Sequence, residues 1–209
     1  LAFAPYGDNA SYYHPPVDRF ERIEVLKGGA QIAHGPQTIG GAVNYITPKP
    51  PAMPGGSLAL AGGNRDYVNG HGTVGTTVGR TGMLFDYTRK QGNGARDNLD
   101  FTLNDITVKL VQGVGNNQQW TFRGNYYSED STVTYSGLRQ DEYAANPRGN
   151  PFKNDFFQAD RIGASATQAL AVNGNVALTT NLYWSTFDRD WWRQSSNSAQ
   201  RPNDASDPL

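Results

Sequence analysis

Long segments in which apolar and polar residues strictly alternate limit what this chain can fold into more than any other feature. In the segment 119–128, Trp120, Phe122 and Tyr126 alternate with polar residues. The pattern recurs in three further segments, 105–110, 161–170 and 175–187. Because successive side chains of a β-strand point to opposite faces, these segments are predicted to be strands with one apolar and one polar face.

Seven such strands are expected, and their connections alternate in length. The predicted strands are 57–63, 68–79, 82–91, 101–112, 118–129, 159–170 and 175–187. The connections 80–81, 113–117 and 171–174 are short, whereas 93–100, 130–158 and the tract after 188 are long. Alternating short and long connections are typical of a membrane β-barrel, whose hairpins face opposite sides of the bilayer. The first connection, 64–67, is short where this pattern requires a long one.

A soluble β-sandwich would also alternate, but three features favour a membrane barrel. Most of the strands run to about 10–13 residues, which exceeds the usual length in soluble sheets and suits a tilted membrane strand. The polar face is rich in Asn, Thr, Ser, Arg and Asp, as in a wet lumen. Aromatic residues lie toward strand ends, as in an interfacial girdle: Tyr126, Tyr127, Tyr183, Trp184, Trp191 and Trp192. Since lipid cannot satisfy an open sheet edge, and seven strands do not close such a barrel, the sequence is expected to be part of a longer chain.

The composition is consistent with an all-β protein and argues against several other classes. The chain has 24 Gly, 12 Pro and 11 Tyr, and no cysteine for a disulfide or a thiolate metal site. A net charge of -1 without a basic stripe argues against nucleic-acid binding. The sequence lacks nucleotide-binding glycine motifs and a GxSxG elbow, and His14, His34 and His71 share no metal-ligand spacing. The abrupt ends indicate either a trimmed domain or cuts inside a longer polypeptide.

The stretch RIEVLKGGAQIAHGPQTIGGAVNYIT, residues 22–47, precedes the alternating segments. Two β-branched runs flank a segment whose glycines are Gly28, Gly29, Gly35, Gly40 and Gly41. The stretch resembles the end of the plug domain of TonB-dependent outer-membrane receptors. The wider sequence is similar to the ferric-citrate receptor branch of that family in APYGDNASYYHPPV, in YSGLRQDEYAANP and in the following FFQADR.

This resemblance implies the architecture of the protein. The expected fold is all-β: a membrane β-barrel of roughly 22 strands whose lumen holds a small α+β plug. Residues 1–50 would be the C-terminal part of the plug, and residues 51–209 the first seven antiparallel strands. The expected location is the outer membrane of a Gram-negative cell, in contact with lipid and lipopolysaccharide.

The resemblance also implies a function, the import of a ferric chelate such as ferric citrate or a similar siderophore. The protein would not be an enzyme and would need no cofactor, since the iron arrives already ligated. Its energy would come from TonB with ExbB/ExbD, acting on a segment before Leu1. Importers of oligosaccharide or cobalamin, and a passive porin, are the alternatives.

Five residues are candidates for binding the chelate. Tyr6, Asp8 and Asn9 match a plug loop that faces the ligand in the citrate branch, which has Gln where this chain has Asp8. Arg189 and Arg193 open the loop after the seventh strand, where the citrate branch supplies a ligand-binding arginine; Asp188 stands at the matching position, and Arg189 is the next residue. Guanidinium groups suit carboxylates because of their bidentate geometry. An alternative role for these two arginines is a solvated loop charge or a cation–π partner of Trp191 or Trp192.

Overall fold

The computed structural model describes residues 13–27, 41–134 and 136–193, which form two antiparallel sheets. The N-terminal segment, residues 13–51, contains the 3-10 turn η1 (Val17–Arg19) and the two-stranded sheet of β1 (Arg22–Leu26) and β2 (Ala42–Ile46). The larger sheet contains β3 (Gly55–Gly62), β4 (Val68–Val78), β5 (Thr81–Asn93), β6 (Asp100–Val114), β7 (Gln118–Ser131), β8 (Phe156–Asn173) and β9 (Val176–Trp192). One helix, α1 (Gln140–Ala145), lies between β7 and β8.

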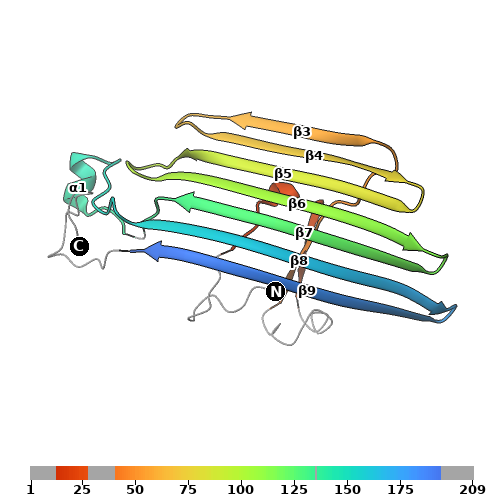
Figure 1. Ribbon diagram of the computed structural model, residues 1–209. Helices are drawn as coiled ribbons and strands as arrows, with labels where there is room; N and C mark the ends of the chain where they lie inside the picture. Colours follow the sequence, from red (N-terminus) through yellow and green to blue (C-terminus); the bar gives the residue numbers. More distant parts are fainter. Residues whose placement is uncertain (1–12, 28–40, 135, 194–209) are drawn as a thin grey trace.

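The larger sheet is a simple meander in which each strand pairs antiparallel with its sequence neighbours (Figure 1). The prediction of seven long antiparallel strands is therefore confirmed. The last two strands are longer than predicted, with 18 residues in β8 and 17 in β9. Their backbone pairing runs on to Phe156↔Trp192, past the point where the apolar/polar alternation fades. Backbone hydrogen bonding does not require that alternation, so periodicity alone underestimates their length.

The two faces of this sheet differ in composition. The inner face, which the N-terminal segment covers, carries the paired residues Asp86, Thr107 and Asn125 of successive strands. The outer face carries large apolar side chains that are exposed, including Leu60 (75%) and Leu182 (65%). A polar inside and an apolar outside are the arrangement expected of a membrane barrel wall.

The N-terminal segment lies against the inner face, where Figure 1 shows it behind the middle strands. Its two strands pair from Arg22↔Ile46 to Leu26↔Ala42, as the two β-branched runs predict. Phe20 stacks on Tyr45 with ring centroids 4.6 Å apart. Tyr13 packs edge-on against the buried Tyr127 of β7, at 4.8 Å between ring centroids.

The proline-rich linker 47–51 joins the two sheets and is fixed to the strands beneath it. The Lys109 ammonium donates to the Thr47 hydroxyl at 2.7 Å, and the Thr77 hydroxyl donates to the Pro51 carbonyl oxygen at 2.8 Å. A Cβ added at Gly75 would lie 2.7 Å from Pro51 Cδ. Glycine is thus required where the linker crosses the sheet, because any side chain would collide with it.

Two features depart from the sequence-based expectations. Helix α1 lies within the connection 130–158, which was predicted only to be long; the Glu142 carboxylate accepts from the Arg139 backbone N–H at 2.7 Å and caps the helix N-terminus. Tyr127 is not a girdle residue, because it lies on the inner face with 2% exposure, and the pairing places Tyr183 and Trp191 on the same face. A girdle side chain must face outward, as Tyr126 and Trp184 do.

No helix among the described residues is long and apolar enough to cross a membrane.

Candidate functional site

The structure describes two of the five predicted ligand-binding residues. Tyr6, Asp8 and Asn9 lie outside the described residues, as do Gly28, Gly29, Gly35 and Gly40 of the predicted glycine motif. Gly41 is described, and its φ of 137° is a conformation that side-chain-bearing residues rarely adopt. A glycine is therefore needed immediately before β2.

Arg189 and Arg193 lie together at the end of β9 that leads into the long connections. Arg189 pairs with Ala159 of β8 and projects to the inner face. The guanidinium carbons of Arg189 and Arg193 lie 5.6 and 5.8 Å from the centroid of the Trp191 ring. The cation–π contact considered as an alternative is thus present. It leaves the charge in place, so it is compatible with anion binding.

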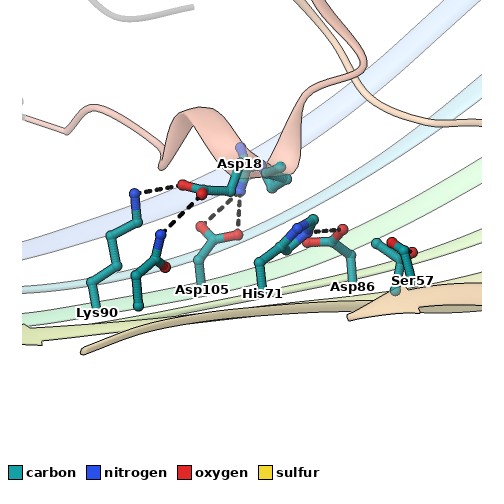
Figure 2. A network of polar contacts seen from close by, with 9 residues as sticks. Asp18, Ser57, His71, Asp86, Lys90 and Asp105 are labelled. Carbon is teal, nitrogen blue, oxygen red and sulfur yellow. Dashed lines mark hydrogen bonds and ion pairs between the residues drawn. The ribbon is translucent and has the colours of Figure 1, made fainter. Parts of the chain in front are cut away.

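The most extensive polar arrangement in the described residues is a network between η1 and the inner face of β4, β5 and β6. Figure 2 shows Asp18 of η1 pointing toward Lys90, with Asp105, His71 and Asp86 alongside. The Lys90 ammonium lies 2.5 Å from one Asp18 oxygen, and the Asn69 amide donates to the other at 3.2 Å. Burial alone would raise the pKa of Asp18, but these hydrogen bonds outweigh it and hold the pKa below its ordinary value.

Arg19 and Asp105 form the buried centre of this network. One terminal guanidinium nitrogen of Arg19 donates to both carboxylate oxygens of Asp105, at 2.9 and 2.8 Å. The side chains are 9% and 0% exposed, respectively. Burial opposes the charged form of Arg19, yet the nearby Tyr13 and Asp105 reverse the effect and raise its pKa. Such a pair is costly to break from one side, because the remaining charge stays buried.

A second pair lies beside the first, where His71 Nε2 of β4 contacts a carboxylate oxygen of Asp86 at 2.9 Å. Asp86 is 1% exposed and His71 is partly buried. On the next strand pair toward the edge, the hydroxyls of Ser57 and Thr73 lie 2.9 Å apart (Figure 2). The network therefore extends across four strands, β3 to β6.

Tyr13 closes the other side of the site. The guanidinium carbon of Arg161 on β8 lies 4.7 Å from the centroid of the Tyr13 ring. Burial raises the pKa of the Tyr13 hydroxyl, so it is protonated at neutral pH. Together these contacts fix residues 13–19 to the strands from β4 to β8. Among the described residues, no group of three His, Cys, Asp or Glu side chains is placed to hold a metal ion.

Sequence reasoning did not identify this network as a site. Its signal was present in the alternation, since Asp86, Asp105 and Lys109 occupy the polar positions of predicted strands. A run of charged residues at lumen-facing positions, opposite a plug-like segment, could have marked the interface. Their partners Asp18 and Arg19 carry no periodic signal.

The fold and these contacts indicate the class of protein. Long antiparallel strands with an apolar outer face and a filled polar inner face have the fold of part of the β-barrel of TonB-dependent receptors. No protein-family model matches the chain.

Particular proteins share this fold with the chain. The ferric citrate transporter FecA in its unliganded form has a TM-score of 0.80 and 20% identity, over 92% of this chain and 30% of FecA. BauA, the ferric preacinetobactin receptor from Acinetobacter baumannii, has a TM-score of 0.74 and 18% identity, over 86% of this chain and 28% of BauA. In sequence, the chain is 24% identical over 132 residues to the vitamin B12 transporter BtuB of Photobacterium profundum, which covers 59% of this chain and 22% of BtuB. The chain thus spans less than a third of the length of each of these proteins.

Proposed function

We propose that this chain is part of a TonB-dependent outer-membrane receptor, a transporter rather than an enzyme, that imports a ferric chelate. Ferric citrate or a similar hydroxycarboxylate siderophore is the proposed cargo. The observation that carries the proposal is the likeness to FecA, which covers 92% of this chain and so extends beyond the large sheet into the N-terminal segment. A passive porin needs an open lumen, and a segment fixed across the inner face argues against it.

Residues 1–50 and 51–209 are proposed to be parts of the plug and of the barrel wall. The contacts between them support this division, because they use the chemistry of an internal interface. Arg19 and Asp105 form a buried ion pair, and Asp18 reaches Lys90. The energising partners would be TonB with ExbB/ExbD, and the exposed apolar outer face would contact lipid and lipopolysaccharide.

Tyr6, Asp8 and Asn9 of the plug, with Arg189 and Arg193 of the barrel, are proposed to hold the chelate from the extracellular side. Arg189 projects to the inner face at the loop end of its strand, where it can meet a ligand above the N-terminal segment. A guanidinium–carboxylate hydrogen bond contributes about 1.5–3 kcal/mol when it is partly desolvated. Asp8 stands where the citrate branch has Gln, and because its carboxylate would repel an anion, it favours a chelate other than ferric citrate.

A second cargo class is supported by a separate observation. The similarity to the vitamin B12 transporter BtuB favours a cobalamin importer, and an oligosaccharide importer would fit the same fold. The two classes differ in charge, since a hydroxycarboxylate chelate is anionic and needs Arg189, whereas a neutral cargo does not.

Growth under iron limitation tests the proposal with the full-length gene in a host lacking its own receptors. Ferric citrate or a related ferric hydroxycarboxylate should restore growth, and the Arg189→Ala variant should bind that chelate roughly ten- to a hundredfold more weakly. Arg148→Ala, in the connection before β8, is the matched control and should change binding much less. Uptake of cobalamin, with growth restored by no ferric chelate, would replace the proposed cargo.

Orientation can be tested independently of cargo. Cysteines placed at Ser136, in the long connection, and at Asn173, at the short turn, lie at opposite ends of the strands. An impermeant thiol reagent applied to intact cells should label position 136 and not position 173. Labelling only at position 173 would invert the proposed topology and remove Arg189 from the extracellular side.

A further inference from the structure

The inner face of β6, β7 and β8 carries more positive than negative charge next to the N-terminal segment. Lys109 pairs with Arg123 across β6 and β7, and Arg161 of β8 pairs with Tyr127 on the same face. Arg19 of η1 lies over these strands, and Arg123 is within electrostatic range of Arg19 and Arg161. We call Arg19, Lys109, Arg123 and Arg161 the inner basic cluster.

Each carboxylate on the inner face beside this cluster already has at least one hydrogen-bond partner. Asp105 is held by Arg19, and Asp86 by His71. The Glu129 carboxylate accepts hydrogen bonds from the hydroxyls of Tyr127 and Ser131. In the part of the chain that the structure describes, Arg123 and Arg161 form no ion pair with a carboxylate, and Arg161 instead lies over the Tyr13 ring.

Hydrogen-bond donors without acceptors lie in the same place. Asn125 Nδ2, the Thr107 hydroxyl and Arg19 Nε are buried and have no hydrogen-bond partner among the described residues. Thr107 and Asn125 are directly paired across β6 and β7. Buried donors are rarely left unpaired, because each one loses its hydration without gaining a partner. Asp86 Oδ1, an acceptor, is likewise buried without a hydrogen-bond partner, but it lies on β5, two strands away from Asn125.

Gly163 brings two of these groups together. It pairs with Asn125 across β7 and β8, and a Cβ built on it would lie 2.6 Å from Asn125 Oδ1 and 3.0 Å from an Arg161 guanidinium nitrogen. The missing side chain thus provides the space in which the Asn125 amide oxygen and the Arg161 guanidinium approach each other. That oxygen is an acceptor, so the donors left for an oxyanion are Asn125 Nδ2 and the guanidinium groups of Arg123 and Arg161.

We propose that Arg123, Asn125 and Arg161 form an anion-binding site on the inner face, for a carboxylate or a similar oxyanion. The proposal rests on the proposed transport function, in which the site would be a second anion-binding site that the cargo reaches after Arg189. Arg189 pairs with Ala159, so Arg161 lies two residues further along β8, and Ser165, opposite Arg123, lies four residues beyond Arg161. At about 3.3 Å per residue, these steps are roughly 7 and 13 Å along the strand. An anion leaving Arg189 therefore meets successive cations on one face.

The carboxylate could come from a transported chelate or from another part of the protein, and an engineered thiol distinguishes the two sources. Ser165→Cys places the thiol opposite Arg123 on the inner face, in the full-length receptor with any native cysteines replaced. Its rates of reaction with an anionic sulfonatoethyl and a cationic trimethylammonioethyl methanethiosulfonate are then compared. A free anion site should favour the anionic reagent about tenfold relative to a receptor that also carries Arg123→Gln and Arg161→Gln. Added citrate should slow the anionic reagent, and high salt should reduce the preference.

Two controls keep the test specific. Arg123→Lys with Arg161→Lys should retain most of the preference, which separates charge from folding. Arg89→Gln, on the outer face of β5, should leave it unchanged. A preference that survives the double glutamine change overturns the proposal. If citrate does not reduce the preference, the site binds a carboxylate of the protein rather than a transported chelate. Failure of every ferric chelate to restore growth would instead refute the transport function, and the thiol result does not depend on it.

Discussion

The inner and outer faces of the seven-stranded sheet are built from the same strands but follow opposite rules. On the outer face, Leu60 and Leu182 are largely exposed, whereas on the inner face Asp105 and Tyr127 are almost completely buried. A soluble protein would place the apolar side chains inside. The difference shows that each face is matched to its own environment, lipid outside and a polar, filled lumen inside.

Separating the chain from the membrane and from the remaining barrel wall should cause the largest loss of stability. Within the described residues β3 and β9 are edge strands, and both would expose unpaired backbone groups in the isolated 209-residue chain. We expect this polypeptide to show no cooperative thermal transition in water when it is followed by circular dichroism. A sharp, reversible melt would mean that the apolar outer face is stable against water.

Breaking the buried ion pair of Arg19 and Asp105 should cause the second largest loss of stability. Arg19→Met leaves the Asp105 charge buried and should destabilise the attachment of the N-terminal segment by about 3–5 kcal/mol, measured by protease protection of the full-length protein across a urea titration. The double variant Arg19→Met/Asp105→Leu should recover much of the loss. Arg22→Met is the control, because its ion pair with Glu24 is exposed and should contribute less than about 1 kcal/mol.

A charge placed on either face should distinguish the two environments directly. Leu182 faces outward, and its neighbour Asn181 faces inward, where it accepts a hydrogen bond from Thr167. Leu182→Arg in the full-length receptor should cost about 2–4 kcal/mol of folding free energy in lipid vesicles, and Asn181→Arg should cost much less. Equal costs would contradict the assignment of the two faces.

Lowering the pH should weaken the attachment of the N-terminal segment at Asp18, and this should be the smallest of the effects. Because the pKa of Asp18 is depressed in the folded state, its contribution is fully present above its ordinary value of 3.8. That contribution is lost as the pH falls through the lower folded value. We expect a loss below about 1 kcal/mol in the protease-protection assay, absent in Asp18→Asn. An Asp18→Asn variant with the same acid response as the parent would assign the effect to another group.

The strand architecture could be predicted from sequence because one local rule generates it. Alternation in segments such as 118–129 specifies both strand and face, and the meander follows from the short connections. Helix α1 was missed because its six residues are too few for a helical period and were hidden in a long connection. Tyr127 was misassigned because an aromatic near a strand end resembles a girdle residue until its face is considered.

The candidate site could not be predicted to the same extent. The Arg19–Asp105 contact joins residues 86 positions apart, and only the three-dimensional placement of η1 over β6 reveals it. The predicted roles of Arg189 and Arg193 came from family resemblance, and they remain predictions. Local patterns specify which face a side chain occupies, whereas the partner across the lumen depends on how the N-terminal segment lies.

The linker 47–51 has a mechanical consequence. Its prolines cross the sheet directly above Gly75 and Gly82, and hydrogen bonds from Lys109 and Thr77 hold it on both sides. The linker therefore fixes the position of the N-terminal segment relative to the sheet. If the segment moves away from the wall, the contacts of Tyr13, Asp18 and Arg19 must break first, while the linker stays in place and serves as the axis of the rotation.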